Sequence, residues 1–354
     1  MRTPDMPIPA SLLEDTINTA AVAVRTPGAW PGNESEAPAW WLAKHQTCSS
    51  PLERYECVRD IGAGGTARVQ LVRVKGTDVE FAMKQVQVAE GHGGALDLLK
   101  VLYVLRELHV LQACGGPPLP RLYDSFYADG TAYLVMTVAQ SGDLMTHLSS
   151  TANHCFCEAT VKQFACHLLE GLERLHKNGI VYVDLKPENL LLQDHDRLVL
   201  VDFGLCCVEE EATVTTSASE LLFAAEREFR QQNSKAEADE GPRFWGTIEY
   251  TAPEVLDGGA AAFSPQSDFW SLGILLYELL YGKTPFRGHN MEQTFYFIQM
   301  RGVQFPERPG EAPPVSYDMQ QLIRCLTRQK PEYRLGINGI QEIRAHRALR
   351  DTSR

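Results

Sequence analysis

Two short polar segments carry residue types that can do phosphate chemistry. The first places a carboxylate, an ammonium and an amide close together, at Asp184, Lys186 and Asn189. The second, Asp202-Phe203-Gly204, directly follows an apolar run. Carboxylate and amide oxygens bind divalent cations, an ammonium neutralises phosphate charge, and a carboxylate can orient an attacking hydroxyl. A solvated polar loop between strands is the plainer alternative, and the occurrence of both segments in this order disfavours it.

The order D-x-K-x-x-N followed by D-F-G resembles the catalytic loop and the metal-binding loop of eukaryotic protein kinases. The resemblance implies ATP and Mg²⁺ as cofactors. Asp184 would then accept or orient the proton of a substrate hydroxyl, and Lys186 would neutralise the γ-phosphate. Asn189 and Asp202 would hold the magnesium ions that bridge the phosphates. A lysine between the loop's aspartate and asparagine is typical of the serine/threonine class, in which Thr247 would brace Asp184 and Lys186.

The elements that must position these groups begin with a predicted glycine-rich hairpin. Alternating strands over residues 55–61 and 70–74 flank a turn whose amides can lie over phosphates, because glycine has no side chain to block the approach. Such a turn is weak evidence alone, but a strand carrying Lys84 follows it, as in kinases. The last glycine of the kinase pattern would fall at Ala67. The resemblance assigns nucleotide contacts here to Ile61, Gly62, Gly64, Val69, Ala82 and Lys84.

Residues 95–114 are predicted to form one amphipathic helix, because leucines recur at spacings of three and four. The resemblance pairs Glu107 of this helix with Lys84, an ion pair that holds the lysine on the phosphates. Outside this context a solvated glutamate would be the default. A hairpin over residues 119–137 follows, leading into the segment that resembles the kinase hinge. Nucleotide contacts expected from there onward are the gatekeeper Met136, backbone groups of Thr137 and Ala139, the ribose-binding Asp143, and Leu191.

Further segments extend the resemblance from about Tyr55 to Leu349. Residues 158–178 form a predicted core helix with no assigned chemistry, and His176 on it is expected to be structural. Asp268 would brace the catalytic-loop backbone, and Glu254 would pair with Arg334. Tyr182 in place of the usual histidine, with Gly302-Val-Gln-Phe-Pro306 and Arg334-Leu-Gly336, resembles the AGC group. The sequence ends at Arg354 without the C-terminal aromatic motif of that group, so we expect that mode of regulation to be absent in cis.

Three positions depart from the AGC pattern together. Val183 replaces the arginine before the catalytic aspartate, Cys207 replaces a basic residue after the metal-binding loop, and Arg243 replaces the phosphorylatable threonine. In AGC kinases the arginine and lysine positions clamp the activation-loop phosphate. Because the phosphate acceptor and its cationic clamp are missing together, we expect activity without phosphorylation at that site.

The resemblance also suggests a substrate preference. Glu188, Asp143 and Glu278 fall where carboxylates would favour arginine two or three residues before the serine or threonine that is phosphorylated.

Two further segments are expected outside this machinery. The activation segment, residues 202–254, contains a polar insertion over about 208–242 with a helix near residues 219–230. Residues 1–50 are a proline-rich tail, predicted to be partly disordered, with a short helix that starts at a Ser11 capping box. Its tryptophans, Trp30, Trp40 and Trp41, would pack on the domain or dock a regulatory partner.

Composition bounds the class of protein. A net charge of −12 disfavours unaided binding to nucleic acid or to anionic membranes, because both are polyanions. Apolar content of 44% and charged content of 22% are ordinary for a soluble globular protein. The nine cysteines lack metal-ligand spacing, which favours reduced thiols in a cytoplasmic, intracellular setting. No segment has the length of a membrane span.

The expected fold is the α+β, two-lobed protein kinase fold over residues 51–350. A small antiparallel β-sheet lobe would take about 51–139 and a larger helical lobe about 140–350. The expected function is transfer of the γ-phosphate of ATP to serine or threonine in protein substrates. The alternatives are a nucleotide-binding pseudokinase scaffold, motivated by Ala67, Val183 and the insertion, and a small-molecule kinase, which the peptide-supporting segment before Glu254 disfavours.

Overall fold

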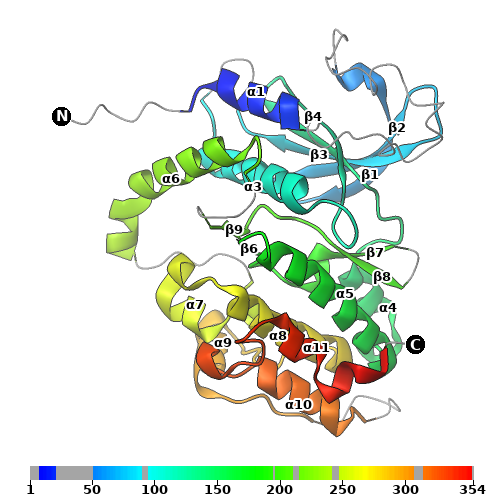
Figure 1. Ribbon diagram of the computed structural model, residues 1–354, viewed down its shortest axis with the longest axis vertical. Helices are drawn as coiled ribbons and strands as arrows, with labels where there is room; N and C mark the ends of the chain where they lie inside the picture. The colour runs from blue at the N-terminus through cyan, green and yellow to red at the C-terminus, as the bar shows by residue number, and fades with distance from the viewer. Residues whose placement is uncertain are drawn as a thin grey trace. The chain divides into compact units, whose positions relative to one another are not determined.

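The computed structural model describes residues 8–20, 51–89, 95–193, 196–209, 215–240, 247–306 and 314–352. The three tail tryptophans and Arg243 lie outside these ranges, so the expectations placed on them stay predictions. The chain divides into two compact units (Figure 1). The first unit comprises Met1–Val138 with Val214–Ser234, and the second comprises Ala139–Thr213 with Lys235–Arg354. Part of the predicted insertion therefore belongs to the first unit, although the chain enters it from the second.

The first unit is built on a five-stranded antiparallel sheet in the order β1-β2-β3-β5-β4. Its members are β1 (Tyr55–Ala63), β2 (Arg68–Val74), β3 (Glu80–Gln87), β4 (Leu122–Ala128) and β5 (Thr131–Met136). The register places Lys84 between Val69 and Leu134, and Ala82 between Leu71 and Met136.

Helix α3 (Leu98–Cys114) is the predicted amphipathic helix, shortened at its start. Asp97 caps it, because its side chain accepts a hydrogen bond from the Lys100 N–H at 3.2 Å. The prediction placed the start at residue 95 and missed this cap. Four of the predicted leucines are buried, and so are the five consecutive residues Glu107 to Leu111. A helix turn buried on every side must be covered by more than the sheet.

Helix α1 (Ala10–Ala20) lies along β4 in the first unit (Figure 1). Leu13, Ile17 and Ala20 are completely buried, and the Asn18 side chain accepts a hydrogen bond from the Tyr127 N–H at 2.9 Å. The Pro9 carbonyl accepts the first helical hydrogen bonds, so Ser11 lies inside the helix and does not cap it. The described start of the tail is therefore packed onto the sheet.

Helix α6 (Ser219–Glu240) is the predicted helix of the insertion and extends ten residues beyond the expected end at Arg230. Its first part, up to Ser234, belongs to the first unit. The apolar residues Ala218, Leu222 and Ala225 are completely buried. The insertion is thus a packed element of the first unit over these residues.

The second unit is mainly helical, with two short antiparallel strand pairs, β6 with β9 and β7 with β8. The strands are β6 (Ile180–Val181), β7 (Leu190–Gln193), β8 (Arg197–Leu200) and β9 (Cys207–Val208). The helices are α4 (Leu144–Ser150), α5 (Glu158–His176), α7 (Pro253–Gly258), α8 (Pro265–Tyr281), α9 (Met291–Met300), α10 (Tyr317–Leu326) and α11 (Ile340–Arg344). The predicted apolar face of α5 is buried, which confirms it as a core helix. A sheet in one unit and a helical second unit make the protein α+β, as predicted.

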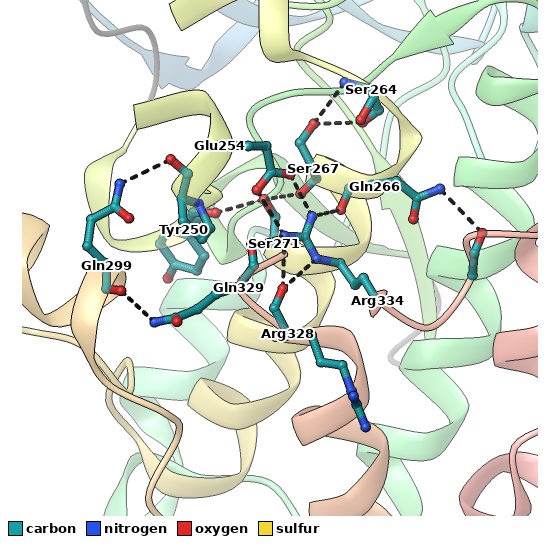
Figure 2. Close-up of polar contacts among 12 residues, drawn as sticks. Tyr250, Glu254, Ser264, Gln266, Ser267, Ser271, Gln299, Arg328, Gln329 and Arg334 are labelled. Atoms are coloured by element: carbon teal, nitrogen blue, oxygen red, sulfur yellow. Dashed lines mark hydrogen bonds and ion pairs between the residues drawn. The ribbon is translucent and has the colours of Figure 1, made fainter. Parts of the chain in front are cut away.

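Helix α8 is the central buried element of the second unit. Arg334 connects neighbouring segments to it by hydrogen bonds (Figure 2). The Arg334 guanidinium donates to both Glu254 carboxylate oxygens, at 2.7 and 2.9 Å, and to the Gln266 carbonyl at 2.6 Å. It also donates to the Arg328 carbonyl and lies 5.3 Å from the Trp270 ring. A planar guanidinium can make these contacts at once, which lysine cannot. The start of α7, α8 and the segment before α11 are thereby held together.

Among the described residues, no helix combines the length and apolarity needed to cross a lipid bilayer.

Candidate active site

The catalytic-loop backbone of the second unit is held by one buried carboxylate. Asp268, in the first turn of α8, accepts the Tyr182 N–H and the Val183 N–H, each at 2.9 Å. His176 at the end of α5 contacts the same carboxylate through Nε2 at 2.7 Å, a structural role for that histidine. Val183 has φ of +73°, a conformation that a β-branched residue rarely adopts. The carboxylate therefore maintains a strained turn directly before Asp184.

Asp184 is the centre of a compact charge cluster. The Lys186 ammonium donates to Asp184 Oδ2 at 2.7 Å and to the Thr247 hydroxyl at 3.3 Å. The Asn189 amide nitrogen donates to the carbonyl and to Oδ2 of Asp184, both at 2.9 Å. Asp184 and Asn189 are buried. The structure thus brings together four of the side chains that the sequence singled out, with the carboxylate fixed on two sides.

Tyr182 joins the catalytic loop to the segment that carries Asp202. Its hydroxyl donates to the Val201 carbonyl at 2.5 Å, and its ring lies edge-on to Phe203 at 5.8 Å. Complete burial raises the pKa of the Tyr182 phenol well above its usual range, so it stays a neutral donor. The Val201 N–H donates to the Asn189 carbonyl at 3.0 Å, next to the start of the β7–β8 pair. Both expected metal ligands are therefore attached to one backbone network.

The donor set at Asn189 and Asp202 fits a magnesium ion. The Asn189 amide nitrogen is committed to Asp184, so its amide oxygen is the atom left to ligate. Asp202 supplies a carboxylate and has φ of +63°, which the surrounding hydrogen bonds must maintain. Among the described residues, no three His, Cys, Asp or Glu side chains gather as a metal-ligand set. A cation held here would complete its shell with phosphate and water oxygens, the usual arrangement for Mg²⁺.

In the first unit, Lys84 on β3 and Glu107 on α3 form a close ion pair. The Lys84 ammonium lies 2.5 Å from Glu107 Oε2, and the two side chains are 13% and 4% exposed. Both charges are largely removed from water, so each needs the other. The structure brings these two residues together across 23 positions of sequence.

The glycine-rich turn between β1 and β2 is open. The Gly64 N–H donates to the Ala67 carbonyl at 2.9 Å, and Ile61, Gly62 and Gly64 are exposed. A methyl group added at Gly65 would meet no described atom within 4 Å. The described chain therefore does not require these glycines for its own packing, which leaves room for a ligand's phosphates over the turn.

The remaining expected nucleotide contacts are divided between the two units. In the first, Met136 is buried at the end of β5, and the Thr137 N–H donates to the Arg121 carbonyl at 3.0 Å, so only the Thr137 carbonyl is left for a ligand. In the second, Ala139 is half-buried. Asp143 forms a β-bridge with Leu191 and caps α4, accepting the Thr146 N–H and hydroxyl at 2.7 Å each. This cap was not predicted, although an aspartate directly before a helix is a signal for it.

Glu278 in the second unit has two other carboxylates, Glu188 and Glu249, and one cation, Arg287, among its charged neighbours. It is buried on α8 and accepts a hydrogen bond from the Tyr250 hydroxyl. Burial, with the neighbouring charges of Glu188 and Glu249, raises the pKa of the Glu278 carboxyl to about 7. Glu188 itself is exposed. Tyr250 was not assigned a role from the sequence, and its proximity to Glu278 depends on tertiary structure.

Comparison with known proteins agrees with this arrangement. The family model described as "Protein kinase domain" matches residues 55–348. Phototropin-2 of Oryza sativa subsp. japonica is 36% identical over 303 residues, covering 85% of this chain and 32% of that protein. Human cGMP-dependent protein kinase 2 is 34% identical over 306 residues, covering 85% and 35% respectively. Serine/threonine-protein kinase ppk22 of Schizosaccharomyces pombe is 35% identical, covering 82% and 55%.

The chain spans about a third of the length of the first two of these relatives. The match nevertheless includes the strands of both units, the helices from α3 to α11 and every residue of the clusters around Asp184 and Lys84. The α+β fold predicted from the sequence is thus the two-lobed kinase fold. The chain belongs to the eukaryotic protein kinase family, among its AGC-like serine/threonine kinases.

Proposed function

We propose that this protein is an active kinase that transfers the γ-phosphate of ATP to serine and threonine hydroxyls of protein substrates. The observation that carries the proposal is the cluster in which Lys186 and Asn189 both contact the Asp184 carboxylate. A pseudokinase scaffold has no need of this arrangement. The Lys84–Glu107 ion pair of the first unit supports the same function, because it is the device that positions the phosphates in active kinases.

In the proposed reaction Asp184 orients the substrate hydroxyl and takes its proton. Lys186 neutralises charge that builds up on the transferred phosphoryl group, and Thr247 keeps the ammonium in place. Asn189 and Asp202 would hold Mg²⁺, which when bound supplies charge neutralisation on the phosphates. Lys84 binds the α- and β-phosphates. The protein's contribution is positioning and electrostatics, which is what phosphoryl transfer requires.

We also propose a preference for arginine two or three residues before the acceptor. The support is the group of carboxylates at Glu278, Glu188 and Glu249: burial, and after it repulsion from Glu188 and Glu249, raises the pKa of Glu278. An arginine side chain would relieve that repulsion and let Glu278 ionise. Opposite charge thus favours a basic peptide over a neutral one.

A third part of the proposal is activity without an activation-loop phosphate. The support is that Val183 and Cys207 provide no cationic clamp, while the loop between them is held by Asp268 and Tyr182. A soluble, intracellular location and a regulatory partner for the tail are two further predictions.

The deciding experiment uses the full chain made in a host without eukaryotic kinases, with its phosphorylation state read by mass spectrometry. Phosphate transfer from ATP and Mg²⁺ to a basic serine peptide is measured for wild type and for Asp184→Asn. The isosteric variant should lose about 10²–10⁴-fold in kcat, the typical worth of a general base. Turnover by unphosphorylated wild type supports the proposal. ATP binding without turnover would favour the scaffold, and activity that disappears on phosphatase treatment would refute independence from phosphorylation.

A further inference from the structure

Helix α6 of the insertion packs against α3, the helix that carries Glu107 (Figure 1). The contact is buried: Leu222 and Ala225 are completely inaccessible, and Glu226 is only 6% exposed. Every side chain from Glu107 to Leu111 of α3 is buried as well. The insertion is therefore more than a surface loop, because it covers the face of α3 that the sheet leaves open.

A charged pair fixes the two helices at the centre of this contact. Nε and Nη2 of Arg106 both donate to Glu226 Oε1, each at 3.1 Å. The Arg106 and Glu226 side chains are 16% and 8% exposed, so neither charge is solvated well enough to tolerate loss of the other. Arg230, one turn further along α6, approaches the second Glu226 oxygen at 3.5 Å.

Two more residues of α3 continue the same stripe at intervals of three. His109 Nδ1 contacts the Thr216 hydroxyl at 2.9 Å and the Ser219 hydroxyl at 3.1 Å. The Gln112 amide donates to the Ser217 hydroxyl and to the Ala20 carbonyl at the end of α1, both at 2.8 Å. Residues spaced by three lie on one side of a helix. One side of α3 is thus hydrogen-bonded to Ser219 of α6, to the two residues Thr216 and Ser217 before it, and to the end of α1.

Arg106 immediately precedes Glu107, so the two side chains leave α3 about 100° apart. One points to Glu226 on α6 and the other to Lys84 on β3. A rotation of α3 about its axis cannot break one ion pair without straining the other. Since catalysis requires Glu107 to hold Lys84, whatever sets the rotation of α3 also sets the catalytic competence of the first unit.

We propose that Glu226 is a positioning residue for phosphoryl transfer: it acts through Arg106 to keep Glu107 on Lys84. The insertion then supplies, from within the activation segment, a support for α3 that does not depend on phosphorylation. This inference rests on the proposed kinase function and extends it to a residue outside the family's catalytic set. A purely structural role would stabilise the fold and leave the kinetic constants of the folded enzyme unchanged.

The test compares Glu226→Gln, which keeps the shape and removes the charge, with Glu220→Gln on the same helix as a matched control. Glu220 is exposed and has no role in the contact described above. Both are assayed on the full chain at a temperature where thermal unfolding shows each to be folded. Glu226→Gln should raise the KM for ATP and lower kcat, with at least a tenfold loss in kcat/KM, while Glu220→Gln matches wild type. The double variant Arg106→Glu with Glu226→Arg restores a pair of opposite charges, so its kcat/KM should lie between those of Glu226→Gln and wild type.

Amide hydrogen exchange over residues 98–114 gives a second readout that does not need turnover. Exchange in this segment should be faster in Glu226→Gln than in wild type and unchanged in Glu220→Gln. Wild-type exchange and wild-type kcat/KM in Glu226→Gln would overturn the inference, as would a loss of stability with unchanged kinetic constants. An inactive wild type would instead refute the proposed function, and faster exchange in Glu226→Gln would still support the coupling of α6 to α3.

Discussion

Asp268 holds Val183 in a left-handed backbone conformation: Oδ1 of the carboxylate accepts the Val183 N–H at 2.9 Å, at a residue with φ of +73°. Left-handed geometry costs an L-residue about 1–2 kcal/mol. The hydrogen bonds of the buried carboxylate must offset that cost. They also set the direction in which the next residue, Asp184, leaves the loop.

Asp268→Asn should therefore impair both stability and catalysis. An amide keeps the shape but offers one acceptor where two N–H groups and His176 Nε2 converge, and it introduces a buried donor facing them. We expect a loss of about 2–4 kcal/mol in the free energy of unfolding, measured in urea, since a buried charged hydrogen-bond network loses one partner. The kcat should fall at a temperature where the variant remains folded, because the Asp184 carboxylate loses its fixed position.

Val183→Gly is the control that separates strain from hydrogen bonding. Glycine adopts positive φ without steric cost and keeps the N–H that Asp268 accepts. Relief of strain should exceed the entropic cost of glycine, leaving the variant about 0.5–1 kcal/mol more stable with kcat preserved. A destabilised Val183→Gly would show that the positive φ of Val183 costs the wild-type protein little.

Several of these relationships were readable in the sequence, because they depend on local pattern. Alternation predicted the strands over residues 55–61 and 70–74, the match to the kinase pattern predicted the strand that carries Lys84, and leucine spacing predicted α3 to within three residues of its start. The motif order around Asp184 and Asp202 predicted the family, which the comparison confirmed. In these cases neighbouring residues carry the information.

Contacts between distant segments were readable only where the family resemblance supplied them, as it did for Glu254 with Arg334 and for Asp268 with the catalytic loop. Arg106 and Glu226 are 120 residues apart, and each looks like an ordinary solvated charge on its own helix. Glu278 lies in an apolar run, but nothing local shows that Tyr250 would donate to it. The insertion was interpreted as a surface segment from its polar composition, because its buried residues, such as Leu222 and Ala225, are few and scattered. Long-range packing decides these features, and a single sequence carries no direct record of it.

The burial of His109 at the α3–α6 contact predicts that the protein loses stability as the pH falls. Burial lowers the pKa of the His109 imidazole from 6.5 to about 4. The unfolded chain therefore binds a proton below pH 6.5 that the folded protein does not, so stability is complete above this pH and is lost as the pH falls towards 4. We expect about 2 kcal/mol less stability at pH 5 than at pH 7.5 from this group alone.

His109→Gln isolates the effect, because the amide can still bond the Thr216 and Ser219 hydroxyls without titrating. Chemical denaturation at several pH values between 7.5 and 5 should show a shallower loss in the variant than in wild type. Parallel curves for the two proteins would mean that His109 is protonated as easily in the folded state as in the unfolded chain.

The raised pKa of Glu278 predicts that the preference for basic peptides depends on pH. Burial and the charges of Glu188 and Glu249 raise the pKa of this carboxyl to about 7, so it is mostly neutral at pH 6 and mostly ionised at pH 8. Only the ionised form attracts arginine. The KM for a peptide with arginine before the acceptor should therefore fall by up to about tenfold from pH 6 to pH 8, following the ionised fraction. Steady-state kinetics at fixed, saturating ATP measure this directly.

A matched peptide with alanine in place of arginine serves as the control, because any effect of pH on the phosphoryl-transfer step affects both peptides equally. Its KM should change little over the same range, and Glu278→Gln should remove the difference between the two peptides while leaving the Tyr250 hydroxyl with an acceptor. Tyr250→Phe should move the transition to higher pH, because the Tyr250 hydrogen bond lowers the Glu278 pKa. If both peptides follow the same pH profile, or if Glu278→Gln keeps the arginine preference, the selectivity must come from carboxylates elsewhere on the second unit.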